Sequence, residues 1–165
     1  MSDKLTVNST ENFEEGHVRR LVELFEHTIP FHRLLGIQVG KLEPGRAQLR
    51  LERTKELMGD PFRGSLHGGV LATLADAAGG LSVFSLLGPE DRASTIDLRL
   101  DYLRPSGITG SLLADARVLR GGSRVFMVEV IIHEGNPELA FARASGVYNV
   151  LRRGERESGP TGRAG

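Results

Sequence analysis

Hydrophobic residues recur along this chain with two different periods. Near its start they follow the i, i+3, i+4, i+7 spacing of an amphipathic helix, at Val18, Leu21, Val22 and Phe25. This spacing predicts a short helix that ends before Pro30. Elsewhere apolar and polar residues alternate, which is typical of β-strands with one buried face.

The alternating segments follow one another through short turns. A pair of strands is expected in the segment 42–52, around the turn at Glu43-Pro44-Gly45. Four longer strands are expected in the second half of the chain, at 95–102, 112–119, 125–133 and 139–151. Turns rich in Gly and Pro separate these four segments, as in an antiparallel meander.

Between the two sets of strands lies a long apolar segment, from Gly68 to Leu87, followed by the helix-stopping pair Gly88-Pro89. A helix that is apolar nearly all round is a buried one. Its many Ala and Gly residues would let a sheet approach closely. The expected fold class is therefore α+β, with a long central helix wrapped by a curved antiparallel sheet of five to six strands.

Length and composition indicate a single domain. A chain of 165 residues can bury one substantial core but not two ordinary ones. We assign the domain to 17–151, because the segments 1–16 and 152–165 are polar and show no period. Both end segments are expected to be mobile tails.

The charge balance and the cysteine count exclude several classes of partner. The chain has 21 Lys and Arg against 21 Asp and Glu, so no basic field draws it to nucleic acid or to a membrane surface. It has no cysteine, which excludes disulfides and thiolate metal sites, and its histidines show no metal-ligand spacing. The polar first residues do not resemble a secretory signal. A cytoplasmic protein without a metal or other cofactor is expected.

One charged residue, Asp76, interrupts the long apolar segment. Removing a carboxylate from water costs several kcal/mol, so a buried one needs a partner. Asp76 should therefore either face a polar site or pair with an arginine of the sheet, such as Arg99 or Arg117. The first arrangement predicts a catalytic carboxylate, and the second predicts a structural charge.

The expected start of the central helix, at His67-Gly68-Gly69, has its own chemical character. The first N–H groups of a helix have no acceptor within the helix, and the helix dipole is positive there. Glycines at this point would let an oxygen atom approach these donors, as in an oxyanion hole. A tight junction between loop and helix explains the same residues, and both interpretations stay open.

The spacing between these two features predicts the assembly. Gly69 and Asp76 are seven residues apart, which is roughly 10 Å along a helix. A reacting carbon must lie about 3 Å from both the carboxylate and the oxyanion donors. If both groups are catalytic, two copies must set their helices side by side and antiparallel, so that each site is shared between subunits.

The same residues carry a resemblance to a known family. The segments 59–76 and 95–105 resemble hotdog-fold acyl-CoA thioesterases of the phenylacetic-acid-degradation (PaaI-like) type, in particular through His67-Gly68-Gly69, Asp76 and Asp101-Tyr102-Leu103-Arg104-Pro105. The resemblance covers roughly residues 30–150. It is specific for the superfamily and says little about the acyl group.

The resemblance implies hydrolysis of acyl-CoA thioesters to free acid and CoA, without a metal, in a homodimer or homotetramer. Asp76 matches the carboxylate that acts as nucleophile or general base. Gly68 matches the glycine whose N–H polarises the thioester carbonyl, with Gly69 beside it. Thr95 matches a hydroxyl that helps to place the attacking water, and His67 would orient the loop or contact the carbonyl.

Three further residues are candidates for substrate binding. Many relatives have Asn or Gln shortly before His-Gly-Gly, where this chain offers Asp60-Pro61, so Asp60 is a candidate. Arg63 and Arg104 are candidates for the phosphates of CoA, because arginine binds phosphate through two hydrogen bonds. Solvent-exposed loop arginines are the alternative.

Two other functions remain compatible with the sequence. A hotdog hydratase or dehydratase would use His67 and Asp76 as an acid-base pair, and a non-catalytic acyl-CoA-binding protein would keep Asp76 only as a structural charge. The sequence argues against a serine hydrolase, because the chain has no Gly-x-Ser-x-Gly motif and Ser65, His67 and Asp76 are spaced too far apart to form a triad.

Overall fold

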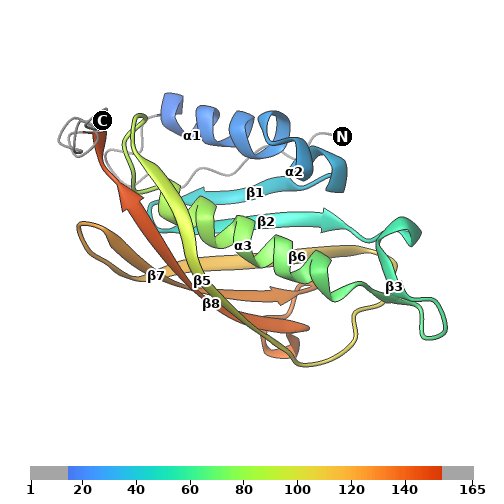
Figure 1. The fold of residues 1–165 in the computed structure, drawn as a ribbon. Coiled ribbons are helices and arrows are strands. Elements are labelled where there is room, and N and C mark those ends of the chain that lie inside the picture. Colours follow the sequence, from blue (N-terminus) through green and yellow to red (C-terminus); the bar gives the residue numbers. More distant parts are fainter. Residues whose placement is uncertain (1–14, 154–165) are drawn as a thin grey trace, which may run out of the picture.

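The computed structural model of the protein describes residues 15–153. Three short helical segments come first: α1 (Glu15–Val22), the π-helix η1 (Glu23–Thr28) and α2 (Pro30–Leu35). They bury Val18, Leu21 and Phe25 and cover one side of the molecule (Figure 1). The predicted amphipathic helix is confirmed and ends at Thr28, before Pro30. A further short helix, α2, begins at Pro30, a residue that is well suited to the first position of a helix.

A six-stranded antiparallel sheet forms the body of the protein. Its strands are β1 (Gln38–Glu43), β2 (Arg46–Glu52), β5 (Arg92–Tyr102), β6 (Ser111–Gly121), β7 (Val125–His133) and β8 (Ala142–Leu151). They lie side by side in the order β1-β2-β6-β7-β8-β5. A separate small hairpin of β3 (Met58–Asp60) and β4 (Ser65–Leu66) precedes the long helix.

Strand β5 has a special place in this sheet. It follows the long helix in the chain and pairs with the last strand, β8, so that it forms one edge of the sheet (Figure 1). The register sets Thr95 opposite Tyr148, beside a shift in the ladder between Thr95 and Asp97.

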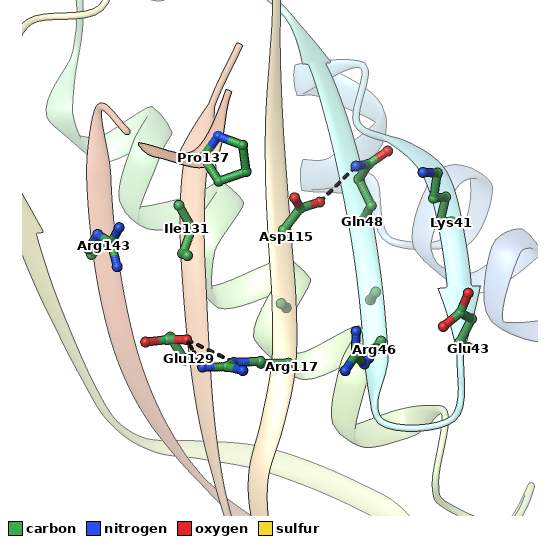
Figure 2. A pocket seen from close by; sticks show the side chains of 12 residues that line it. Lys41, Glu43, Arg46, Gln48, Asp115, Arg117, Glu129, Ile131, Pro137 and Arg143 are labelled. Atoms are coloured by element: carbon green, nitrogen blue, oxygen red, sulfur yellow. Dashed lines mark hydrogen bonds and ion pairs between the residues drawn. The ribbon is translucent and has the colours of Figure 1, made fainter. Parts of the chain in front are cut away.

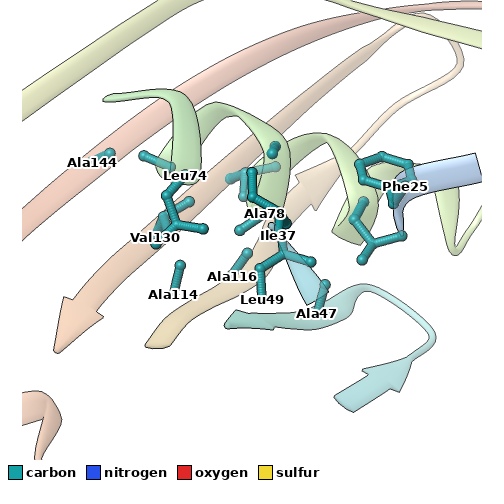
Figure 3. Packing of buried hydrophobic residues seen from close by; sticks show 14 of the residues in the cluster. Phe25, Ile37, Ala47, Leu49, Leu74, Ala78, Ala114, Ala116, Val130 and Ala144 are labelled. Atoms are coloured by element: carbon teal, nitrogen blue, oxygen red, sulfur yellow. The ribbon is translucent and has the colours of Figure 1, made fainter. Parts of the chain in front are cut away.

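The long helix α3 (Gly68–Phe84) packs against the concave side of the sheet. Its inward side chains meet the alternating apolar residues of the strands, and Leu74, Ala75, Ala78 and Leu81 are fully buried (Figure 3). A methyl group at Gly79 would overlap the hydroxyl of Tyr148. The small residues of α3 therefore set how closely the helix approaches the sheet.

The expected α+β hotdog architecture is confirmed in class, in helix position and in strand number. Several boundaries differ from the sequence predictions. Strand β1 begins at Gln38, before the predicted segment 42–52, and β5 begins at Arg92 rather than at residue 95. The helix ends at Phe84 rather than Leu87. The last strand begins at Ala142 because Pro137–Leu139 form a short 3₁₀ turn, in which the Asn136 side chain accepts a hydrogen bond from Glu138 N–H.

The two expected tails, 1–16 and 152–165, fall almost entirely outside the described residues and stay predictions. At their margins, Glu15 and Gly16 already belong to α1. At the other end, Arg152 binds the carboxylate of Asp91 at 2.9 Å. The ordered domain thus extends slightly beyond the predicted range 17–151 on both sides.

Candidate active site

Asp76 lies in the middle of α3, next to strands β5 and β8 of the sheet, and its side chain is partly exposed. It lines a small cavity of about 180 Å³. The other walls come from the N-terminal helices, from the end of α3 and from strands β5 and β8: Phe25, Ile29, His32, Ala77, Gly80, Phe84, Ala93, Ser94, Thr95 and Tyr148. The carboxylate therefore faces a cavity that four separate parts of the chain enclose.

Hydroxyl groups, rather than a cation, hold Asp76 in place. The Thr95 hydroxyl donates a hydrogen bond to Oδ1 of Asp76 at 2.7 Å. The Tyr148 hydroxyl donates to the backbone oxygen of Asp76 at 3.0 Å. Burial and the negative charge of Asp76 raise the pKa of Tyr148, so this hydroxyl keeps its proton.

The alternative of a structural ion pair is wrong for both arginines that the sequence offered. Arg99 binds Asp101 at 3.1 Å. Arg117 binds Glu129 at 2.8 Å, on the opposite face of the sheet. Asp76 instead has one oxygen bonded to the Thr95 hydroxyl and lines the cavity, which is the arrangement expected of a catalytic carboxylate.

His32 shares this cavity and was missed by the sequence analysis, which considered His32 only as a metal ligand. Its side chain is buried, with 8 % exposure, and Nδ1 lies 3.0 Å from the backbone oxygen of Phe25. Burial lowers the pKa of His32, against smaller opposing effects of the Phe25 carbonyl and of the Asp76 charge. Only the folding of α2 alongside α3 brings His32 to Asp76, so no local pattern could have shown it.

At the N-terminus of α3, His67 is the cap of the helix. Its Nδ1 accepts a hydrogen bond from Gly69 N–H at 2.9 Å, and its backbone oxygen accepts from Val70 N–H at 3.0 Å. The N–H of Gly68, in contrast, donates to no group among residues 15–153. Gly68 thus offers the free donor of the first turn, while His67 orients the turn.

Tyr102 also belongs to this end of the helix. Its hydroxyl donates to the backbone oxygen of Gly68 at 3.0 Å, and a methyl group at Gly68 would lie 3.1 Å from the same hydroxyl. Gly68 is therefore a position where a side chain would be crowded. The sequence analysis used Tyr102 only as part of the family motif and did not predict this contact.

The two halves of the predicted chemistry lie in different cavities of one chain. His67 and Gly69 line a cavity of about 430 Å³ together with Phe31 and Val70. Asp76 belongs to the other cavity, about 180 Å³ in size. The separation agrees with the roughly 10 Å that the helical rise predicts. One chain does not bring its carboxylate and its helix N-terminus to one substrate carbon.

Asp60 and Arg63 lie on the β3–β4 hairpin, away from the Asp76 cavity. Asp60 Oδ1 accepts hydrogen bonds from the N–H groups of Phe62 and Arg63, at 2.9 and 3.1 Å, so this carboxylate closes the hairpin turn. The Arg63 side chain is exposed and lies 3.8 Å from Asp60. In the free chain, Asp60 thus organises a turn and Arg63 extends into solvent.

Arg104 is occupied within its own chain. Its guanidinium stacks over the ring of Phe141 at 4.1 Å and donates hydrogen bonds to the backbone oxygens of Leu139 and Ala140. It also lines a cavity of about 360 Å³ that Gly68 and Tyr102 share. Arg104 is therefore close to the helix N-terminus, with two of its five N–H donors bonded within the chain.

Another hollow, of about 580 Å³, lies on the other face of the sheet, away from α3 (Figure 2). Charged residues such as Arg46, Asp115 and Glu129 line it, and it contains none of the predicted site residues. It is an open polar surface, in which Gln48 donates to Asp115 at 2.7 Å. The volume of a cavity does not by itself identify the active site. The cavity of Asp76 is the better candidate because several polar side chains converge there.

Two properties of residues 15–153 bear on other functions. Within this part of the chain, His and carboxylate side chains nowhere gather in threes that could hold a metal ion. Every helix described is too short or too polar to span a bilayer.

Comparison with known sequences gives a consistent result. The family model described as Thioesterase superfamily matches residues 63–141. The medium/long-chain acyl-CoA thioesterase YigI of Salmonella typhimurium is 35% identical over 149 residues, covering 82% of this chain and 95% of that protein. A putative esterase of Halobacterium salinarum is 43% identical over 123 residues, covering 73% of this chain and 80% of its own length.

Solved structures show the same fold. A Shewanella oneidensis protein related to the thioesterase superfamily superposes with a TM-score of 0.75 at 29% identity, over 85% of this chain and 99% of that one. The Escherichia coli PaaI protein from the phenylacetic acid degradation operon superposes with a TM-score of 0.73 at 21% identity, over 82% and 94% of the two chains. The second likeness is evidence for the fold alone.

Proposed function

The chain belongs to the thioesterase superfamily and has the hotdog fold, and we propose that it hydrolyses acyl-CoA with Asp76 as its catalytic carboxylate, in a site that two copies share. The observation that carries this proposal is the environment of Asp76. Thr95 holds one carboxylate oxygen at 2.7 Å, and the carboxylate faces a cavity. A carboxylate in an otherwise apolar helix lowers the stability of the fold through desolvation. A catalytic role is a reason for such a residue to be kept there.

The chemistry follows from groups already in place. Asp76 either attacks the thioester carbon itself, giving an anhydride that water opens, or removes a proton from an attacking water. In both routes negative charge develops on the carbonyl oxygen. The N–H of Gly68, at the positive end of a helix dipole, is the donor that we assign to this oxygen. The C–S bond then breaks, and CoA leaves as the thiolate and takes up a proton.

The shared site is supported by the edge of the sheet. Strand β5 has no neighbour beyond it in the strand order. It presents large apolar side chains to solvent, with Ile96 59% and Tyr102 56% exposed. Exposed apolar edge strands pair readily with another chain. Antiparallel pairing of β5 with its copy would continue the sheet and set the two α3 helices antiparallel, so that each Asp76 approaches the partner's helix N-terminus.

Substrate contacts complete the proposal. Arg63 is exposed and available for CoA phosphates, and Arg104 could contribute the N–H donors that its bonds to Leu139 and Ala140 leave over. YigI, named for medium- and long-chain acyl-CoA, makes acyl-CoA of these lengths the first substrates to test. A dimer, alone or paired into a tetramer, is the proposed assembly, and the cytoplasm, where acyl-CoA is produced, is the proposed location.

The decisive experiment is thiol release from acyl-CoA of graded chain length and aromaticity. Asp76→Asn should lower turnover by at least about 10²-fold, as expected for loss of an acid-base catalyst, while the fold and assembly stay intact. Glu138→Gln changes an exposed carboxylate that lines none of the described cavities, and this matched control should keep parental activity.

Three outcomes would overturn the assignment. Parental hydrolysis by folded Asp76→Asn would remove Asp76 from the reaction. Saturable CoA binding without any thiol release would indicate a binding protein. Hydration of an enoyl-CoA without thiol release would indicate a hydratase.

A further inference from the structure

The cavity of Asp76 contains a second hydrogen-bond acceptor, the imidazole of His32. Nδ1 of His32 lies 3.0 Å from the backbone oxygen of Phe25. A carbonyl oxygen only accepts, so Nδ1 must carry the proton of the neutral ring. The lone pair is then on Nε2. This atom bonds to no group of residues 15–153 and is not among the buried unpartnered atoms, so it is open to the cavity.

Asp76 offers the other acceptor. Its Oδ1 is bound by the Thr95 hydroxyl at 2.7 Å. The Tyr148 hydroxyl lies close to the carboxylate as well, but directs its single proton to the backbone oxygen of Asp76 at 3.0 Å. The second carboxylate oxygen is therefore left to bind a ligand in the cavity.

Two acceptors that face one small space require an occupant that donates two hydrogens. We propose that Asp76 and His32 together hold the hydrolytic water, with one hydrogen bonded to the free oxygen of Asp76 and the other to Nε2 of His32. A water occupies roughly 30 Å³, and the cavity of about 180 Å³ leaves room for it beside a substrate. This inference rests on the proposed function and selects its general-base route.

The step balances without any further reagent. Asp76 takes one proton from the water as the new C–O bond forms at the thioester carbon. The other hydrogen stays on the water oxygen and is hydrogen-bonded to Nε2 of His32, which remains neutral. Because both hydrogens are held by acceptors, a lone pair of the water oxygen is directed at the thioester carbon. The tetrahedral intermediate breaks its C–S bond, and the departing thiolate receives the proton from Asp76. The products are the free acid and CoA.

Two substitutions at His32 separate this role from a structural one. In His32→Asn, the amide nitrogen can replace Nδ1 and still donate to Phe25, but the distant acceptor is lost. In His32→Gln, the longer side chain can present an oxygen near the position of Nε2, while the bond to Phe25 is lost. His32→Asn thus keeps the donor that replaces Nδ1, and His32→Gln keeps the acceptor that replaces Nε2.

A water-holding role predicts that His32→Asn lowers kcat about 10-fold or more with little change in KM, while His32→Gln keeps most of its turnover. A role in anchoring α2 alone predicts the reverse order. Thermal melting and the oligomeric state of both variants verify folding. Parental kcat in His32→Asn, or greater loss in His32→Gln, would overturn the inference.

The pH profile gives a second measurement. Protonated His32 can no longer accept, so kcat should fall as the pH drops through the pKa of His32, which burial lowers from 6.5. The groups that face His32 are Asp76 on α3, whose charge opposes this shift, and the neutral Tyr148 on β8. In both variants this decrease should move to lower pH. An unchanged profile in His32→Asn would contradict the inference.

The same assay must include Asp76→Asn. If Asp76→Asn loses turnover and His32→Asn does not, only the role of His32 is wrong. If both retain parental turnover, the proposed catalytic role of Asp76 fails with it.

Discussion

At the scale of single residues, the site depends on the hydrogen-bonding state of Asp76. A hydrogen bond to a charged group contributes about 1.5–3 kcal/mol, and Thr95 supplies one to Oδ1 at 2.7 Å. Because Thr95 lies on β5 and Asp76 on α3, this bond also fixes the carboxylate relative to the edge of the sheet. Thr95 therefore orients the carboxylate that we propose as the base.

Replacement of Thr95 tests this orientation. Thr95→Val keeps the shape of the side chain but removes the donor, and we expect kcat/KM to fall about 10-fold, which corresponds to roughly 1.4 kcal/mol. Thr95→Ser keeps the donor and should stay within a few-fold of the parent. Equal rates for the valine and serine variants would show that the hydroxyl has no part in turnover.

At the scale of elements, the close packing of α3 on the sheet sets the position of Asp76. Gly79 and Gly80 follow Asp76 closely in the helix, and both face Tyr148. The Tyr148 ring takes the space that a side chain at Gly79 would fill. The hydroxyl of Tyr148 can then reach the backbone of Asp76.

These two glycines give a matched pair of variants. Alanine normally stabilises a helix by about 1 kcal/mol relative to glycine. At Gly79 the added methyl would overlap the Tyr148 hydroxyl, so Gly79→Ala should destabilise the protein by about 1–3 kcal/mol. At Gly80 the nearest Tyr148 atom would lie 3.8 Å away, and Gly80→Ala should be neutral or stabilising. Urea denaturation measures both, and equal effects would contradict this packing argument.

At the scale of the whole molecule, the proposed site needs two chains. A single chain separates the Gly69 cavity from the Asp76 cavity, and β5 leaves an apolar edge for a second copy. Dimer formation would place each active site at the contact between subunits, so dissociation should abolish turnover even if each chain stays folded.

Mixing two inactive variants tests this sharing. Asp76→Asn removes the carboxylate, and Gly68→Val blocks the helix N-terminus. In a dimer with shared sites, a mixed dimer regains one intact site of two, so random reassociation should restore about a quarter of parental activity. If each site lay within one chain, the mixture would stay inactive.

Much of the architecture follows from local pattern. Periods of 3.6 and 2 residues identify the helices and strands, because each element must bury one face. The isolated charge of Asp76 in an apolar helix indicated a site, and its distance from Gly69 indicated two chains. Arg104 shows the limit of this reasoning, since residue type suggested phosphate binding while its contacts in the fold are with Phe141 and nearby carbonyls.

The sequence by itself thus determined the α+β class, the buried helix and the position of its one carboxylate, since these depend on neighbours in the chain. Only the tertiary structure decided which groups meet that carboxylate. Thr95 reaches it through the register of β5 with β8, and His32 through the packing of α2 beside α3. Such contacts join residues that are far apart in the chain. The local sequence pattern predicts which face of a helix or strand a residue lies on, but it does not predict which distant residue that face will meet.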